Sequence, residues 1–284
     1  MNSIMNIVAS NGYNYLRTAL IAVATTLILV GCDYELSPWQ TDVYCPGQSV
    51  DENLALIKQI EQTKQIGDSF KVALLGDPQQ FPEDFDETIK LLNTYAEVDF
   101  IILLGDLVET GLKQEFEWTC KAMNHSNKPI IPVIGNHDSL SYGVDIWLQT
   151  FGEYDFTFSY LGTKFVAYND NQYEFEDVPD LDWLEQASAI SDDETRLHTI
   201  GMSHIEPWGR APDLSQFLAK NGFDQMLHAH KHKFAYYQRE EVGLPHFITA
   251  DTQDVKFAIM TVTPDTITIE QCDPVCLPAE IEIR

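Results

Sequence analysis

Apolar runs and amphipathic segments alternate along the first half of the chain. Uninterrupted apolar runs, which are typical of buried strands, occupy residues 70–75, 100–104 and 129–134. Apolar residues at helical spacing lie between these runs, at residues 84–97 and 112–123. This strand–helix order predicts a mostly parallel sheet with helices on its faces. Ligands bind at the carboxyl ends of the strands in such sheets, so those ends are where chemistry is expected.

The second half of the chain is also predicted to form strands and helices, but they alternate less regularly. Strands are predicted at residues 154–160, 164–169, 197–202, 223–227, 234–239, 246–249, 255–262 and 266–269. Helices are predicted at residues 180–190 and 213–220, and an irregular helix at 54–66. The last four strands alternate apolar and polar residues, a pattern typical of antiparallel pairing. We therefore expect one α/β domain over residues 67–284.

The N-terminus carries a separate apolar segment. Residues 19–30 are twelve consecutive small, apolar or Thr residues, fewer than the ~20 that span a membrane but suited to an export signal. The ending Leu29-Val30-Gly31-Cys32 resembles the lipobox of bacterial lipoproteins. That resemblance implies a signal peptide at 1–31, a lipid on Cys32 that anchors the protein to a membrane of the cell envelope facing the periplasm, and a tether and N-terminal segment at 32–66. A plain secretory signal or an uncleaved anchor is the alternative.

The chain is strongly acidic. It has 44 acidic and 17 basic residues; Arg17 is the only charged residue before Cys32, so the mature chain would carry 44 acidic against 16 basic residues, a net charge of −28. The electrostatic field of this negative charge repels nucleic acid, and the sequence has no cluster of basic residues to offset it. No nucleic-acid partner is therefore expected.

Four cysteines follow Cys32. Cys45, Cys120, Cys272 and Cys276 could form two disulfides in any of three pairings in an oxidising compartment. Because Cys45 lies near one end of the chain and Cys272 and Cys276 near the other, a disulfide between the two terminal segments is one expected arrangement. A metal site is the weaker interpretation, since no histidine accompanies these cysteines.

Potential metal ligands follow five of the predicted strands. The residues are Asp77, Asp106, Asn136 with His137, His204, and His230 with His232. Carboxylate, amide and imidazole groups all bind divalent cations, whereas a chance distribution would also place them on helices. In Gly135-Asn136-His137-Asp138, His137 can carry a proton near neutral pH and Asp138 can hold it in one tautomer. The same tetrapeptide is also an ordinary surface-turn sequence.

In their order, these motifs resemble those of the calcineurin-like metallophosphoesterases. The matching segments are Gly105-Asp106, Gly135-Asn136-His137-Asp138, His204 and Ala229-His230-Lys231-His232, within about residues 70–262. The resemblance implies an α/β fold of four α/β/β/α layers, in which two mixed sheets are flanked by helices. It also implies two divalent metal ions, for which Mn, Fe and Zn remain open, and a phosphorylated substrate.

The resemblance also assigns roles to individual residues. Asp77, Gln79, Asp106 and His232 would hold one metal, Asp106, Asn136, His204 and His230 the other, and His137 would assist the leaving group. Two positions depart from the pattern. Ala229 replaces a glycine, which is tolerated if the backbone there is not at positive φ. Gln79 replaces a histidine, as in a subgroup of the family with an Asp-Pro-Gln first motif, and amide oxygen is a poorer zinc ligand than imidazole.

Two functions follow from these observations. The first is metal-dependent hydrolysis of a phosphomonoester or phosphodiester. The alternative is a lipoprotein that binds or senses metal without turnover, because Gln79 weakens one of the two sites.

Overall fold

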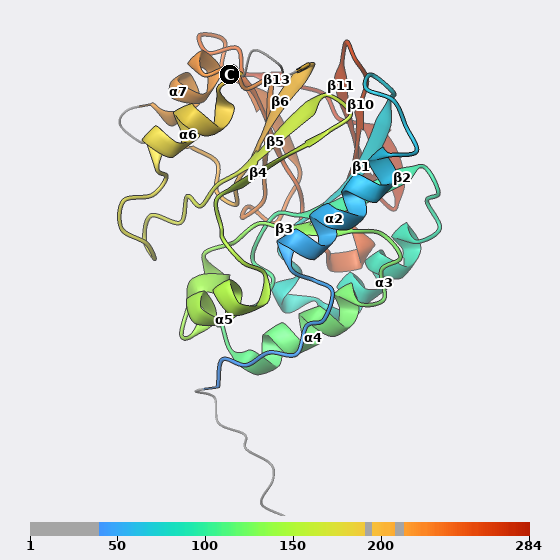
Figure 1. The fold of residues 1–284 in the computed structure, drawn as a ribbon, viewed down its shortest axis with the longest axis vertical. Coiled ribbons are helices and arrows are strands. Elements are labelled where there is room, and N and C mark those ends of the chain that lie inside the picture. Colours follow the sequence, from blue (N-terminus) through green and yellow to red (C-terminus); the bar gives the residue numbers. More distant parts are fainter. Residues whose placement is uncertain (1–39, 191–194, 208–212) are drawn as a thin grey trace, which may run out of the picture. The chain divides into compact units, whose positions relative to one another are not determined.

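Two β-sheets packed face to face form the centre of the computed structural model, which describes residues 40–190, 195–207 and 213–284 (Figure 1). The first sheet has the order β12-β11-β10-β1-β2-β3. Its strands are β1 (Phe70–Leu75), β2 (Val98–Leu103), β3 (Ile130–Pro132), β10 (Phe257–Val262), β11 (Ile267–Asp273) and β12 (Val275–Pro278). Strands β1, β2 and β3 pair in parallel and β10, β11 and β12 continue the sheet antiparallel, so the predicted parallel unit is confirmed.

The second sheet has the order β13-β8-β9-β7-β6-β5-β4. Its strands are β4 (Phe156–Tyr160), β5 (Thr163–Ala167), β6 (His198–Met202), β7 (Gln225–His228), β8 (Ala235–Gln238), β9 (Pro245–Ile248) and β13 (Glu282–Ile283). Strands β5, β6, β7 and β9 are parallel neighbours. The expectation of four antiparallel strands at the end of the chain is therefore only partly right, because β9 pairs antiparallel with β8 but parallel with β7.

Helices cover the outer face of each sheet, as Figure 1 shows. Helices α3 (Pro82–Leu92), α4 (Lys113–Met123) and α5 (Gly143–Thr150) pack on the first sheet, and α6 (Leu181–Ser188) and α7 (Leu214–Lys220) pack on the second. This is the predicted four-layer α/β/β/α arrangement of two mixed sheets flanked by helices.

The alternation of side chains along β1 shows why the layers form. Val72 and Leu74 point into the core between the two sheets, while Ala73 and Leu75 point into the core under α3 and α4. All four side chains are fully buried. Because successive side chains of a strand face opposite sides, a continuous apolar run is required here.

Several predicted elements differ from the observed ones in length or were not predicted. Helix α3 ends at Leu92 rather than at 97. Helix α5 was not predicted, although it buries Ile146 and Trp147. Helix α2 (Val50–Glu61) begins four residues before the predicted helix at 54–66, because Ser49 and Glu52 form a capping box at its start.

The expected disulfide between the terminal segments is wrong. Cys45 bonds to Cys120 on α4, and Cys272 bonds to Cys276. Cys272 lies directly opposite Cys276 in the β11–β12 pair, so the hairpin brings these two together. The segment before α2 runs along α4, where Lys113 forms an ion pair with Asp42, so Cys120 is the cysteine within reach of Cys45.

The N-terminal predictions fall outside the described residues. Residues 1–31, Cys32 and the first part of the tether are not among them. All of the described residues belong to one compact unit, Trp39–Arg284. None of the helices in the described part of the chain is both long enough and apolar enough to cross a membrane.

Candidate metal centre

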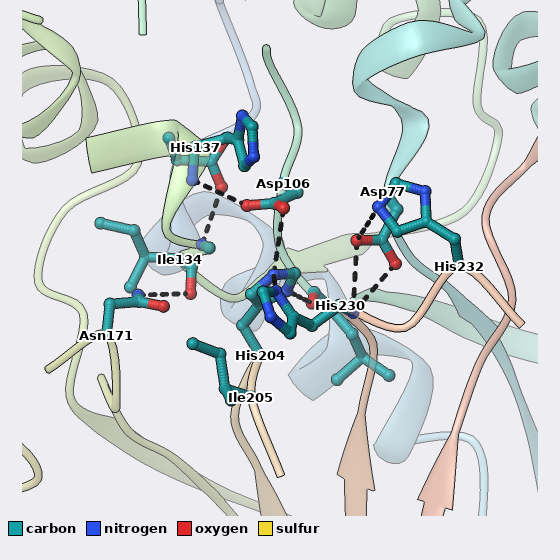
Figure 2. A network of polar contacts seen from close by, with 12 residues as sticks. Asp77, Asp106, Ile134, His137, Asn171, His204, Ile205, His230 and His232 are labelled. Carbon is teal, nitrogen blue, oxygen red and sulfur yellow. Dashed lines mark hydrogen bonds and ion pairs between the residues drawn. The ribbon is translucent and has the colours of Figure 1, made fainter. Parts of the chain in front are cut away.

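The carboxyl ends of parallel strands from both sheets meet at one edge and bring the predicted ligands together (Figure 2). Asp77 follows β1, Asp106 follows β2, His204 follows β6 and His230 follows β7. Backbone hydrogen bonds tie the strand ends to one another: Asp77 N donates to Gly105 O (3.0 Å), and Ala229 N donates to His204 O (2.9 Å). These two bonds each lie within one sheet, and His230 N, which donates to Asp77 Oδ2 (3.1 Å), connects the ligand-bearing loops of the two sheets.

Asp106, His204 and His230 form a cluster in which all three ligand atoms lie within 4.8 Å of one another. His204 Nε2 lies 3.1 Å from Asp106 Oδ2 and 3.3 Å from His230 Nδ1. The other ring nitrogen of His204, Nδ1, lies 2.8 Å from the carbonyl oxygen of Leu104. Because a carbonyl only accepts, Nδ1 carries the hydrogen, and Nε2 is left to bind a cation.

Four of the predicted ligands have an unusual backbone. Asp77, Asp106, His230 and His232 all have φ between 50° and 68°, a region that costs energy for residues other than glycine. Such strain persists where the surrounding structure enforces it and is often found at functional sites. Ala229 is not among the residues at positive φ, so the missing glycine before His230 is tolerated, as predicted.

Two motif glycines allow the close approach of these side chains. A Cβ atom at Gly105 would lie 2.5 Å from His204 Nδ1, and one at Gly135 would lie 2.2 Å from Asp106 Oδ1. Both distances are far below van der Waals contact. Only glycine at these positions lets His204 and Asp106 meet.

Gln79 and Asn136 fit a metal centre because each has a buried side-chain oxygen without a partner. Within the described residues, neither Gln79 Oε1 nor Asn136 Oδ1 accepts a hydrogen bond. A buried amide oxygen without a partner costs roughly 1–3 kcal/mol. A bound cation would remove this cost, and an amide oxygen is a suitable ligand for a hard cation. The residues present therefore fit a divalent metal ion.

His232 lies between two carboxyl groups. Its Nε2 is 3.7 Å from Asp77 Oδ1 and its Nδ1 is 3.4 Å from Asp251 Oδ2. A carboxylate behind a ligand histidine orients the ring and strengthens it as a donor. Sequence reasoning missed Asp251, although it follows β9 closely and β9 is the parallel neighbour of β7. The strand-end rule that found the other residues would have found it.

The expected contact between Asp138 and His137 is absent from the described structure. Asp138 is buried and accepts hydrogen bonds from Val108 N (3.1 Å) and Gly135 N (2.8 Å). His137 instead places its Nδ1 atom 2.7 Å from the carbonyl oxygen of Glu109. Because the short η2 turn (His137–Ser139) points the two side chains in different directions, Asp138 shapes the loop and Glu109 holds the imidazole.

Burial and mutual charge shift the pKa values of the cluster. Burial alone would lower the pKa of His204, but the adjacent Asp106 carboxylate outweighs this and raises it to about 10. Burial raises the pKa of Asp77 to about 7. Burial, together with the positive charge of His204, lowers the pKa of His230 to about 4. In the absence of metal, a proton on His204 therefore compensates the buried carboxyl groups.

A cavity of about 340 Å³ opens beside Asn136 and His230. Its other lining residues come from the loops after β5, β6 and β7 and comprise Gln172, Tyr173, Glu174, Ile205, Glu206 and Lys231. Sequence reasoning placed no function on Gln172, Tyr173 and Glu174, because they lie outside the recurrent motifs, and Lys231 lies inside one only as the variable residue between two histidines. The cavity lies where a substrate bound at the metal centre would extend.

His228 is a buried structural residue next to the candidate metal centre. Its Nδ1 lies 3.1 Å from Ser203 Oγ and its Nε2 lies 3.0 Å from His246 Nδ1, while His246 Nε2 lies 2.9 Å from Ser215 Oγ. Both histidines are buried. Together they link the strand ends that carry His204 and His230 to α7. The spacing of His246 in the sequence did not indicate its contact with His228.

A family profile described as calcineurin-like phosphoesterase matches residues 70–234. The match covers more than half of the chain. The chain belongs to the calcineurin-like phosphoesterases. Among curated protein sequences, none matches this phosphoesterase.

Solved structures of the same fold support the architecture of this phosphoesterase. A purple acid phosphatase, PPD1, from yellow lupin (Lupinus luteus) seeds is 13% identical with a TM-score of 0.59, and the match covers 76% of this chain and 54% of that one. This phosphoesterase thus spans about half the length of the lupin enzyme. GAP50, described as the anchor in the inner membrane complex of Plasmodium, is 12% identical with a TM-score of 0.57 over 76% of this chain and 89% of that one. At these identities the likeness shows the fold alone.

Proposed function

We propose that this protein hydrolyses phosphate esters at a centre of two divalent metal ions. The observation that carries the proposal is the buried cluster of Asp106, His204 and His230 together with the unpartnered oxygens of Gln79 and Asn136. Five loops contribute to this set. Without a cation, the buried amide oxygens of Gln79 and Asn136 would be left without a compensating interaction.

The proposed ligand sets are those that the family's motifs imply, and the cluster of Asp106, His204 and His230 supports the second of them. One metal ion would be held by Asp77, Gln79, Asp106 and His232, and the other by Asp106, Asn136, His204 and His230. Asp106 would belong to both sets; its Oδ2 atom lies against His204, and its Oδ1 atom accepts a hydrogen bond from His137 N at 2.9 Å. When bound, two such cations polarise the phosphoryl oxygens and lower the pKa of a water molecule.

The proposed role of His137 is to exchange a proton with the leaving oxygen. Its Nδ1 is held by the Glu109 carbonyl, so Nε2 is the atom that can face a substrate. Positioned general acids contribute roughly 10²–10⁴-fold to rate. The cavity beside Asn136 and His230 would accept the organic part of the ester.

The alternative is a protein that binds metal without turnover because Gln79 weakens the first site. The buried, unpartnered oxygen of Gln79 favours its use as a ligand. An oxygen ligand in place of imidazole favours manganese over zinc at that position. We accordingly propose manganese as the first metal to test, with iron and zinc as the other candidates.

The proposed place of action is the periplasmic face of a membrane of the cell envelope. It is supported by the lipobox-like segment ending at Cys32 and by the four later cysteines, all of which are paired in disulfides. Disulfides persist in oxidising compartments.

The decisive experiment is hydrolysis of 4-nitrophenyl phosphate and bis(4-nitrophenyl) phosphate by the purified protein with added Mn²⁺. We expect turnover by the wild type and a loss of roughly 10²–10⁴-fold in His137→Ala with unchanged metal content. His125→Ala is the matched control, since His125 is exposed and paired with Asp86 away from the centre. Stoichiometric metal binding without turnover of either ester would refute the proposal and support the metal-binding alternative.

A further inference from the structure

We propose that Lys231 gives the site a preference for phosphomonoesters over phosphodiesters. This inference rests on the proposed phosphoesterase function and concerns the charge of the substrate that the site selects. Lys231 lies between the two proposed ligands His230 and His232. It also lines the cavity that opens beside Asn136 and His230.

The ammonium group of Lys231 is held in place by Glu206. The Nζ atom lies 2.6 Å from Glu206 Oε1. Glu206 lies in the loop after β6, two residues after the proposed ligand His204. The ion pair therefore connects the loop after β6 to the loop after β7, directly beside the residues proposed to hold the second metal.

The burial of the two partners decides which charge a ligand meets. The side chain of Glu206 is 1% exposed, whereas that of Lys231 is 41% exposed. Both residues line the cavity, but the carboxylate is almost completely buried and the lysine side chain is the accessible partner. A molecule in the cavity thus meets a positive charge that is fixed by a buried anion.

The substrate charge that fits this arrangement is that of a monoester. A phosphomonoester carries close to two negative charges at neutral pH, and a diester carries one. Glu174 lies on the cavity wall contributed by the loop after β5 and disfavours negative charge on its own side. The additional charge of a monoester is therefore best accommodated near Lys231, where a charge-assisted hydrogen bond can form.

Four variants separate this role from a structural one. Lys231→Met removes the ammonium but leaves Glu206 buried without its partner, and Lys231→Met combined with Glu206→Gln removes both charges. Glu206→Gln alone keeps the ammonium but loses the charge that positions it. Lys233→Gln is the matched control, because it removes an exposed lysine two residues away that does not line the cavity.

The measured quantity is the ratio of kcat/KM for 4-nitrophenyl phosphate to kcat/KM for bis(4-nitrophenyl) phosphate. We expect this ratio to fall about tenfold in Lys231→Met and in the double variant, as for the loss of one charge-assisted hydrogen bond. The loss should appear mainly in the KM of the monoester, because its charge is present before the reaction begins. Lys233→Gln should keep the wild-type ratio. An unchanged ratio in both Lys231 variants, with active wild type, would overturn the inference while leaving the phosphoesterase function intact.

Binding of inorganic phosphate tests the same residue if the wild type hydrolyses neither ester. That outcome would refute the proposed function, and titration calorimetry of the metal-loaded protein with phosphate would then decide the role of Lys231. Binding about tenfold weaker in Lys231→Met and in the double variant than in Lys233→Gln would support the inference. Equal affinities in all of these proteins would overturn it.

Discussion

The Nε2 atom of His204 lies 3.1 Å from the Oδ2 atom of Asp106, at the junction of the two sheets. Asp106 follows β2 of the first sheet and His204 follows β6 of the second, so the pair exists only when the sheets are stacked. The Leu104 carbonyl fixes the hydrogen on the other ring nitrogen of His204. The fold thereby points a nitrogen lone pair and a carboxylate oxygen at the same position, which is the basic requirement for binding a cation.

Metal affinity should rise with pH. The pKa of His204, about 10 in the metal-free protein, means that its Nε2 is protonated at neutral pH and that a cation must displace the proton. Below pH 10 each unit of pH should therefore increase the apparent affinity about tenfold, with a steeper rise below pH 7, where Asp77 also binds a proton. Chelator competition with Mn²⁺ at pH 6.5, 7.5 and 8.5 measures the slope. A flat dependence would contradict the assignment of His204 as a ligand.

Replacement of Asp251 by Asn should weaken one metal site selectively. Asp251 lies against His232 Nδ1, and loss of such a carboxylate typically lowers metal affinity about 10–100-fold. Calorimetric titration with Mn²⁺ should show that one metal ion binds more weakly than in the wild type and that the other binds with unchanged affinity. Asp254→Asn is the matched control, because the Asp254 side chain is largely exposed and, among the described residues, its only ion pair is a long contact with Lys256. Equal titration curves for wild type and Asp251→Asn would show that Asp251 does not support metal binding.

Replacement of Asp138 by Ala should reduce stability, whereas replacement of His137 should not. Asp138 accepts hydrogen bonds from the buried N–H groups of Val108 and Gly135. Each buried donor left without a partner lowers the free energy of unfolding by about 1–3 kcal/mol. We expect a loss of roughly 2–5 kcal/mol in the free energy of unfolding by urea. His137→Ala should lose less than about 1 kcal/mol, in the range of changes away from the core. Similar losses in the two variants would contradict the separate roles given to these neighbours.

The two disulfides should contribute unequally to stability. Cys45–Cys120 closes a loop of 75 residues and Cys272–Cys276 one of 4. Because a disulfide restricts the unfolded chain more when its loop is longer, replacing the first pair by alanine should cost about 2–4 kcal/mol and replacing the second pair less. Urea denaturation of the two double variants measures both values. A larger loss for the Cys272–Cys276 variant would show that the hairpin disulfide has another role.

The sequence predicted the elements whose patterns are strong and local. Strand β1 was predicted with the observed bounds, since a fully buried strand must be apolar on both faces. Helix α5 was not predicted, because its eight residues follow the site loop without a capping signal. The disulfide pairing could not be read from spacing, because it depends on the path of the segment before α2 along α4.

The sequence also placed the predicted ligands at strand ends, and the structure brings them together, yet it could not show how they are supported. Glu109 holds His137 through a backbone carbonyl, a group that every residue possesses, so no side-chain pattern could have indicated it. The ion pair between Glu206 and Lys231 joins loops from two strands, and only the folded chain brings them together.

Anomalous diffraction from crystals of the Mn²⁺-loaded protein tests the central claim most directly. We expect two peaks about 3.5–4 Å apart, the separation usual in two-metal sites, both within bonding distance of Asp106. One should be bordered by His204, His230 and Asn136, and the other by Asp77, Gln79 and His232. A single peak, or peaks away from Asp106, would contradict the proposed dinuclear centre.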